Sequence, residues 1–263
     1  MPTIRIANGL KIFYRECGSG NRTVVFIHGN VASSLWWEKV MQVLPPGVHG
    51  LAPDLRGCGD SDKPTPDWTL AEVAADVYQF MQALGASRAT VVGHSFGGGV
   101  ALQLAVAHPE AVEKLVLINS APAEGLITSP ESYAQIETLK KSPELVKMAL
   151  AALMPTAPKD EFCTRLLDES VAKSTGAWVA NGHALDRMNL VNEARSIKAP
   201  TLIIYGQKDP LVHLDMMERT RDTIPGAVLE VWEGVGHSAP VEAPLQFALR
   251  LVDFLAMAVP ARG

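Results

Sequence analysis

The sequence predicts an α/β fold: a mostly parallel β-sheet with helices on both faces and a helical insertion. Short apolar runs bounded by turn residues alternate along the chain with longer segments of helical character. Continuous apolar runs are typical of strands that are buried on both faces of a parallel sheet. The alternation is interrupted once, over residues 122–199, where strand-like runs are scarce.

The composition fits one large globular chain of 263 residues. A hydrophobic content of 48% and a charged content of 19% exclude a disordered chain. The net charge is −5 and no cluster of Lys and Arg occurs, which argues against nucleic acid or a membrane as a partner. The oligomeric state stays open.

The cysteines indicate a reducing compartment. Cys17, Cys58 and Cys163 are far apart, odd in number and without the spacing of a metal site, so we expect free thiols, no metal and no cofactor. The first residues contain no apolar signal core, and no run of about 18 apolar residues occurs. A cytoplasmic protein is therefore expected, although a trimmed signal peptide would leave the same sequence.

The N-terminal part predicts a hairpin and then a buried strand. Segments 3–6 and 10–14 alternate apolar and polar residues on either side of Asn8-Gly9, a dipeptide typical of hairpin turns. Residues 24–27 form a continuous apolar run, which predicts a strand of the parallel sheet. The loop after this strand begins with His28-Gly29-Asn30.

A helix over 34–44 and a strand over 48–52 follow. The next helix is expected over 70–84, because Thr69 can act as its N-cap and Glu72 completes a capping box.

The sequence of residues 93–97, Gly-His-Ser-Phe-Gly, fits the G-x-S-x-G nucleophile elbow. The preceding residues 89–92 predict a strand and residues 100–107 a helix, so Ser95 lies on the turn between them. A sharp turn of this kind lifts the serine hydroxyl clear of the sheet, and glycines leave the backbone room to pass close to itself.

A further strand is expected over 115–118, and residues 122–199 then read as a helical cap over the carboxyl edge of the sheet. The core would comprise residues 1–121 and 200–263. From the cap we select Trp178, His183 and Met188 as candidate substrate contacts, with Trp36 from the core. Methionines and aromatic residues more often serve packing than binding.

The remaining elements are expected over 201–205 (strand), 214–223 (helix), 228–232 (strand) and 244–258 (helix).

A serine needs a base to take its proton, and the base needs an acid to orient it. After Ser95 the chain offers Asp209 at the end of a predicted strand and His237 in a later loop framed by glycines. Asp54 precedes the serine and its setting suggests a structural role. Asn119 follows another strand and cannot act as an acid.

Two donors are expected to stabilise negative charge on the substrate oxygen. One is the backbone N–H of Phe96, directly after the nucleophile. The other is Asn30, after the strand at 24–27, whose side-chain amide offers a second route.

These motifs together resemble the α/β-hydrolase superfamily over nearly the whole chain, in particular its small capped esterases, lactonases and cofactor-free haloperoxidase-like enzymes. The resemblance implies Ser95 as nucleophile, His237 as base, Asp209 as acid, and Phe96 and Asn30 as oxyanion donors. Asn30 followed by Trp36-Trp37 also resembles haloalkane dehalogenases, but those enzymes carry aspartate at the elbow. A serine attacking saturated carbon would leave an ether that water does not readily release.

We therefore predict a carboxylesterase-like serine hydrolase for small to medium apolar esters, with lactones as a further class. One alternative is hydrolysis of a carbon–carbon bond in a dienoate or diketone. Such relatives usually carry a bulky aromatic residue after the histidine and basic residues for the substrate carboxylate; here Ser238-Ala239 follows, and Arg165 or Arg187 could supply the charge. Another alternative is a ligand receptor with slow turnover.

Overall fold

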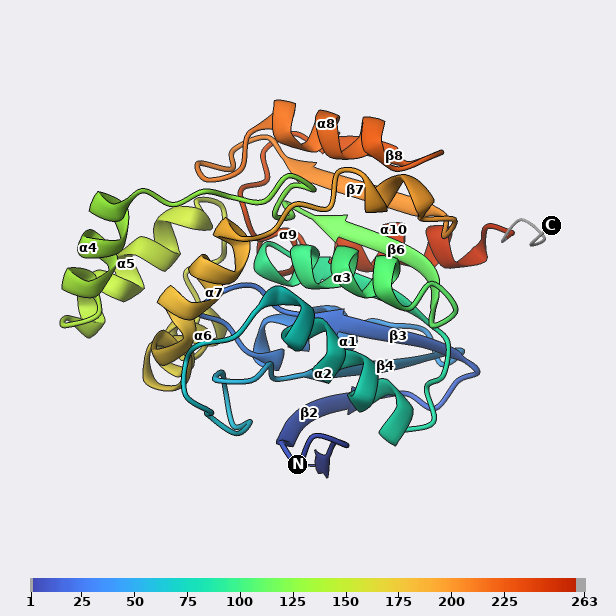
Figure 1. The fold of residues 1–263 in the computed structure, drawn as a ribbon, viewed down its shortest axis with the longest axis horizontal. Helices are drawn as coiled ribbons and strands as arrows, with labels where there is room; N and C mark the ends of the chain where they lie inside the picture. The colour runs from blue at the N-terminus through green and yellow to red at the C-terminus, as the bar shows by residue number, and fades with distance from the viewer. Residues whose placement is uncertain (1, 259–263) are drawn as a thin grey trace.

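The computed structural model describes residues 2–258 and contains one eight-stranded sheet with the order β1-β2-β4-β3-β5-β6-β7-β8. β2 pairs antiparallel with β1 and with β4, and all other pairs are parallel, which confirms the predicted mostly parallel sheet (Figure 1). The strands are β1 (Thr3–Arg5), β2 (Lys11–Cys17), β3 (Arg22–Ile27), β4 (Val48–Pro53), β5 (Ala89–His94), β6 (Val112–Ile118), β7 (Thr201–Gly206) and β8 (Val228–Trp232).

The apolar run in β3 shows why the central strands have no polar face. Val24 and Phe26 belong to one hydrophobic cluster, whereas Val25 and Ile27 belong to another. Because successive side chains of a strand point to opposite faces, each cluster fills one side of the sheet. The sheet is therefore buried on both faces, as the continuous apolar runs predict.

Helices cover both faces (Figure 1). The cluster around Val25 contains side chains of α2, α3 and α8, and the cluster around Val24 contains side chains of α1, α9 and α10. The core helices are α1 (Glu38–Met41), α2 (Leu70–Ala83), α3 (Phe96–Ala107), α8 (Leu214–Thr223), α9 (Ala239–Glu242) and α10 (Pro244–Ala256). Across residues 2–258, no helix combines the length and the apolar character that crossing a membrane would need.

Local signals in the sequence correspond to observed contacts. Asn8-Gly9 turns the chain between β1 and β2, with Gly9 at a φ of 93° that only glycine adopts easily. Thr69 and Glu72 form the predicted capping box at the start of α2. The expected helix over 34–44 is instead a 3₁₀ turn, Ser34–Trp37, followed by the short α1, and α9 begins inside a predicted loop.

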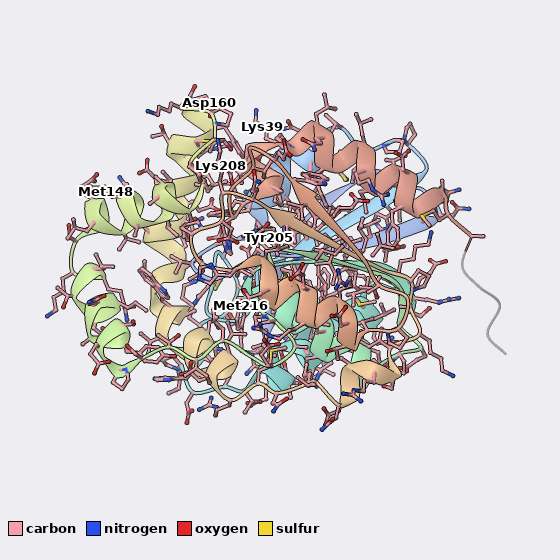
Figure 2. All side chains as sticks on the ribbon, turned by 90° about the horizontal axis from the view of Figure 1, so that it is seen from above. Lys39, Met148, Asp160, Tyr205, Lys208 and Met216 are labelled. Atoms are coloured by element: carbon pink, nitrogen blue, oxygen red, sulfur yellow. The ribbon has the colours of Figure 1, made fainter. Side chains whose placement is uncertain are left out.

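The insertion between β6 and β7 is helical, as predicted, and its four α-helices lie together at one end of the sheet (Figure 1). They are α4 (Pro130–Leu139), α5 (Pro143–Leu153), α6 (Glu161–Ser174) and α7 (Trp178–Asp186). α4 contributes no buried residue. Met148 on α5 is 67% exposed at the outer edge of this insertion (Figure 2). The division into a core and a cap domain stays a prediction.

The turn between β5 and α3 is packed too tightly for side chains at its glycines. A Cβ atom on Gly97 would lie 2.4 Å from the carbonyl oxygen of Ile27 and 2.5 Å from that of His28. A Cβ atom on Gly93 would lie 2.3 Å from the carbonyl oxygen of Gly97. Since these neighbours are backbone atoms, they cannot move aside without displacing β3 or the turn itself.

We expect Gly97→Ala to lower the free energy of unfolding by at least about 2 kcal/mol, because overpacking against backbone exceeds the gain in helix propensity. The matched control is Gly47→Ala, where an added Cβ meets nothing within 4 Å. That control should change stability by no more than about 0.5 kcal/mol. Urea unfolding of both variants checks this, and equal effects would contradict the packing argument.

Candidate active site

Ser95 sits on a strained turn between β5 and α3. Its backbone has φ 54° and ψ −120°, outside the regions that non-glycine residues favour. The Ser95 N–H donates to the carbonyl of Ile118 at 3.0 Å, and its own carbonyl accepts from the N–H groups of Gly98 and Ala121. These bonds fix the turn against the end of β6.

Backbone strain gathers at this edge of the sheet. In the described chain, the non-glycine residues with positive φ are Val31, Ser95 and Asn119. They follow β3, β5 and β6, three neighbouring strands whose carboxyl ends face the insertion. Strained residues of this kind persist where the surrounding structure over-determines them and cluster at functional sites.

The carboxylate of Asp209, in the loop after β7, accepts four hydrogen bonds. Its Oδ1 accepts from the backbone N–H groups of Leu211 (2.7 Å) and Val212 (3.1 Å). Its Oδ2 accepts from Asn119 Nδ2 and from His237 Nδ1, each at 2.6 Å. Burial alone would raise the pKa of Asp209, but the hydrogen bond and charge of His237 and the two N–H groups hold it below its usual value.

His237 is held by its backbone as well as by its ring. Its N–H donates to the carbonyl of Leu153, at the end of α5, and its carbonyl accepts from the ring of His94, both at 2.9 Å. With Nδ1 donating to Asp209, the neutral ring has its free lone pair on Nε2. A base oriented by a buried carboxylate is the arrangement that the sequence predicts.

The two other histidines near the elbow are occupied. His28 Nδ1 donates to the carbonyl of Gly29, and His28 Nε2 accepts from the N–H of Leu55. Burial lowers the pKa of His28, and burial together with the charge of His237 lowers the pKa of His94 to about 3. Both rings are therefore neutral structural groups near pH 7, which leaves His237 as the candidate base among the three histidines.

Ser95 and His237 line the same cavity. Among the hydrogen bonds of residues 2–258, none joins Ser95 Oγ to the ring of His237. Such catalytic hydrogen bonds are often long or misaligned in proteins without substrate and shorten in the complex. The structure thus brings Asp209 and His237 into direct contact and places Ser95 in the wall of the cavity that His237 also lines.

The predicted oxyanion donors differ in whether they already have a hydrogen-bond partner. Phe96 is the first residue of α3, so its N–H has no acceptor within the helix. The Asn30 side chain is engaged: Nδ2 donates to the carbonyl of Trp178, and Oδ1 accepts from Val31 N and Asn181 Nδ2, all at 3.0 Å. The side-chain route from Asn30 is therefore disfavoured, and its backbone N–H is the candidate donor.

A cavity of about 600 Å³ lies between the strand ends and the insertion. Within the described chain, none of its lining residues is Asp, Glu, Lys or Arg. The lining comprises residues from both parts: Gly29, Asn30, Val31, Trp36, His94, Ser95, Phe96, Leu211, His237 and Ser238 from the core, and Leu126, Ile127, Thr128, Ser129, Ser132, Tyr133, Ile136, Ala149, Leu150, Leu153, Trp178, Gly182 and Leu185 from the insertion.

Two of the four candidate substrate contacts line this cavity. Trp36 and Trp178 do, and the Trp36 indole is fixed by a hydrogen bond to Ser170 Oγ at 3.0 Å. His183 and Met188 do not, which corrects the sequence-based selection. The side chain of His183 is 49% exposed and packs against Tyr133 with the two rings tilted by 39°, whereas Met188 is packed in the core next to Gly99.

Asn119 and Asp54, for which the sequence predicts no catalytic role, make hydrogen bonds at this edge of the sheet. Asn119 holds the Asp209 carboxylate and also accepts from the N–H of Gly206 at 3.1 Å. Its place after β6 was visible in the sequence, but its partner depends on β6 and β7 being neighbours in the sheet. Asp54 accepts from the backbone N–H groups of Ser34 and Asp60, consistent with the structural role expected for it.

Metal ligands are not assembled anywhere in the part of the chain that the structure describes, since no group of three or more His, Cys, Asp or Glu is placed to hold an ion. The cysteines are Cys17, which is half-buried, and the buried Cys58 and Cys163, and all three are free thiols.

Comparison with known proteins places these features in a family. The family model described as "alpha/beta hydrolase fold" matches residues 22–244. The chain belongs to the α/β-hydrolase family. A 2-hydroxymuconate semialdehyde hydrolase of Pseudomonas putida is 31% identical over 96% of this chain and 93% of that protein.

Solved α/β-hydrolases have the same fold. An esterase from Exiguobacterium antarcticum superposes with a TM-score of 0.88 at 27% identity, covering 97% of this chain and 99% of that one. Est816, described as an N-acyl homoserine lactone degrading enzyme, superposes with a TM-score of 0.81 at 27% identity, covering 96% and 100% of the two chains.

We expect the free energy of unfolding to fall as the pH is lowered, and His94 to account for part of this fall. Its pKa is about 3 in the folded protein against 6.5 when unfolded, so below pH 6.5 the unfolded chain binds the extra proton. The contribution of the neutral His94 ring to the free energy of unfolding is complete above pH 6.5. As the pH falls from 6.5 toward 3, this contribution is lost at about 1.4 kcal/mol per pH unit.

His94→Gln retains an N–H donor for the carbonyl of His237 but cannot titrate. Urea unfolding between pH 7 and 4.5 should therefore show a shallower loss of stability with acid in this variant. The remaining loss comes from His28 and from carboxyl groups whose pKa is also lowered, such as Glu72 and Asp209. Equal slopes in the two proteins would contradict the assignment of His94 as a buried neutral ring.

Proposed function

We propose that this protein is a serine hydrolase that cleaves neutral, apolar carboxylic esters, and lactones as a further class, through an acyl-enzyme. The observation that carries the proposal is the uncharged cavity of about 600 Å³ with Ser95 and His237 in its wall. A cavity lined by apolar side chains and a few polar groups suits an uncharged substrate, because it has no charged side chain that could pair with a charge on the substrate.

In this mechanism Ser95 Oγ attacks the carbonyl carbon while His237 Nε2 takes the hydroxyl proton. Asp209 stabilises the resulting imidazolium through the Nδ1 hydrogen bond. Negative charge on the carbonyl oxygen is met by the N–H groups of Phe96 and Asn30, each typically worth about 3–4 kcal/mol. The alcohol leaves with the proton from His237.

Water then repeats the sequence on the acyl-enzyme. His237 takes a proton from water, the hydroxide attacks the acyl carbon, and the carboxylic acid leaves as Ser95 regains its proton. All proton transfers thus use one ring, and the carboxylate of Asp209 remains ionised throughout.

Hydrolysis of a carbon–carbon bond is the second candidate, because the relative from Pseudomonas putida is a 2-hydroxymuconate semialdehyde hydrolase. The lining of the cavity argues against a substrate with a carboxylate. Arg165 pairs with Glu38 and Arg187 donates to the carbonyl of Trp68, and neither lines the cavity. The structural neighbours described as an esterase and as a lactone-degrading enzyme support the ester proposal.

The test compares p-nitrophenyl butyrate with p-nitrophenyl hemisuccinate, which adds a carboxylate at similar length. We expect burst kinetics with the neutral ester and a kcat/KM lower by about 100-fold or more with the charged one, since the cavity offers no cation to a buried carboxylate. Ser95→Ala should reduce kcat by at least about 10³-fold.

Preference for the charged ester would contradict the proposal that the substrate is neutral. Turnover of a ring-fission dienoate with no ester hydrolysis would contradict the proposal in favour of carbon–carbon bond cleavage. A folded protein that turns over neither class, but whose melting temperature shifts with a ligand or partner, would contradict it in favour of a receptor.

A further inference from the structure

The loop that carries His237 is held by its backbone N–H groups on both sides of the histidine. Gly236 N donates to Glu242 Oε2 at 3.0 Å, and Ser238 N donates to Glu242 Oε1 at 2.9 Å. The N–H of His237 itself donates to the carbonyl of Leu153. Three successive N–H groups are therefore fixed, two of them by one carboxylate.

The same carboxylate also binds the insertion. Glu242 Oε2 accepts from the backbone N–H of Thr156 at 3.1 Å and from its hydroxyl at 2.5 Å. Thr156 follows α5, whose last residue, Leu153, lines the cavity. The two parts pack closely here, because a Cβ atom on Gly236 would lie 2.5 Å from Pro155 Cδ.

The local fold explains how Glu242 reaches back to the loop. α9 is a single turn, in which the N–H groups of Val241 and Glu242 both donate to the carbonyl of Ser238. This turn brings the Glu242 side chain beside the two peptide groups that flank His237. Hydrogen bonds to an ionised acceptor are stronger than those to a neutral one, so a carboxylate suits four converging donors.

We propose that Glu242 is a positioning residue for the base: it orients the His237 loop and ties that loop to the insertion. The ring of His237 must hold Asp209 with Nδ1 while presenting Nε2 to the cavity, and both depend on the path of residues 236–238. This inference rests on the proposed serine hydrolase mechanism.

The test variant is Glu242→Gln. It keeps the shape of the side chain but replaces one acceptor oxygen with an amide NH₂ group, which cannot accept from the N–H donors of the loop. We expect kcat with p-nitrophenyl butyrate to fall by about 10-fold or more while KM stays within about 2-fold, because a small misplacement of a catalytic group is costly. The rate at which a fluorophosphonate labels Ser95 should fall by a similar factor. The downfield proton resonance of His237 Nδ1–H should shift or broaden.

The matched control is Glu230→Gln on β8, which removes a carboxylate paired with Arg250 and should leave all three readouts within about 2-fold. Thr156→Val is a second variant that removes only one donor, on the insertion side. It should lower kcat by a smaller factor than Glu242→Gln. If Glu242→Gln does not fold, the same three readouts in Thr156→Val test the inference.

Wild-type kcat, labelling rate and His237 resonance in a folded Glu242→Gln protein would overturn the inference, as would wild-type values in Thr156→Val if Glu242→Gln does not fold. Failure of the proposed function is a separate outcome. If the wild type hydrolyses no ester, the labelling rate and the His237 resonance still report on Glu242.

Discussion

The buried carboxylate of Asp209 is the constraint on which the site depends. A buried charge is tolerated only when hydrogen bonds or an opposite charge compensate for the lost water. Its four donors come from Asn119 after β6, from the turn after β7 and from His237 after β8. The charge can be satisfied only when these segments of the sheet have come together, so the fold and the orientation of the His237 ring are set by the same contacts.

The insertion contributes contacts to the candidate site as well as part of the cavity wall. Asn30, after β3, is held by the carbonyl of Trp178 and the amide of Asn181, both in α7. The His237 loop is held by Leu153 and, through Glu242, by Thr156. Movement of the insertion would therefore act on a candidate oxyanion donor and on the candidate base, in addition to opening the neutral cavity.

The sequence was sufficient where the signal is local. The capping box at Thr69, the turn at Gly9 and the sharp turn around Ser95 each depend on a few adjacent residues, and all are present in the structure. The order of Ser95, Asp209 and His237 predicts one site, because parallel strands present their carboxyl ends at one edge of the sheet. In the structure Asp209 contacts His237, and His237 and Ser95 line one cavity.

The parts that were not predictable depend on packing between distant segments. Asn119 gains its partner only because β6 and β7 are neighbours. His183 and Met188 have the residue types of a binding site, but the side chain of His183, on α7, is 49% exposed, and Met188, in the segment after α7, packs in the core. In the same way, Glu242 lies in a one-turn helix, and its hydrogen bond with Thr156, a residue of the insertion, depends on how the insertion packs on the core.

The most direct test of the account is a crystal structure of the protein after reaction with an alkyl phosphonate ester, a tetrahedral mimic of the acylation intermediate. We expect a covalent bond from Ser95 Oγ to phosphorus, with the phosphoryl oxygen about 2.7–3.1 Å from the backbone nitrogens of Phe96 and Asn30. His237 Nε2 should lie within hydrogen-bond distance of the adduct. Labelling at another residue, or a phosphoryl oxygen in contact with neither nitrogen, would contradict the mechanism.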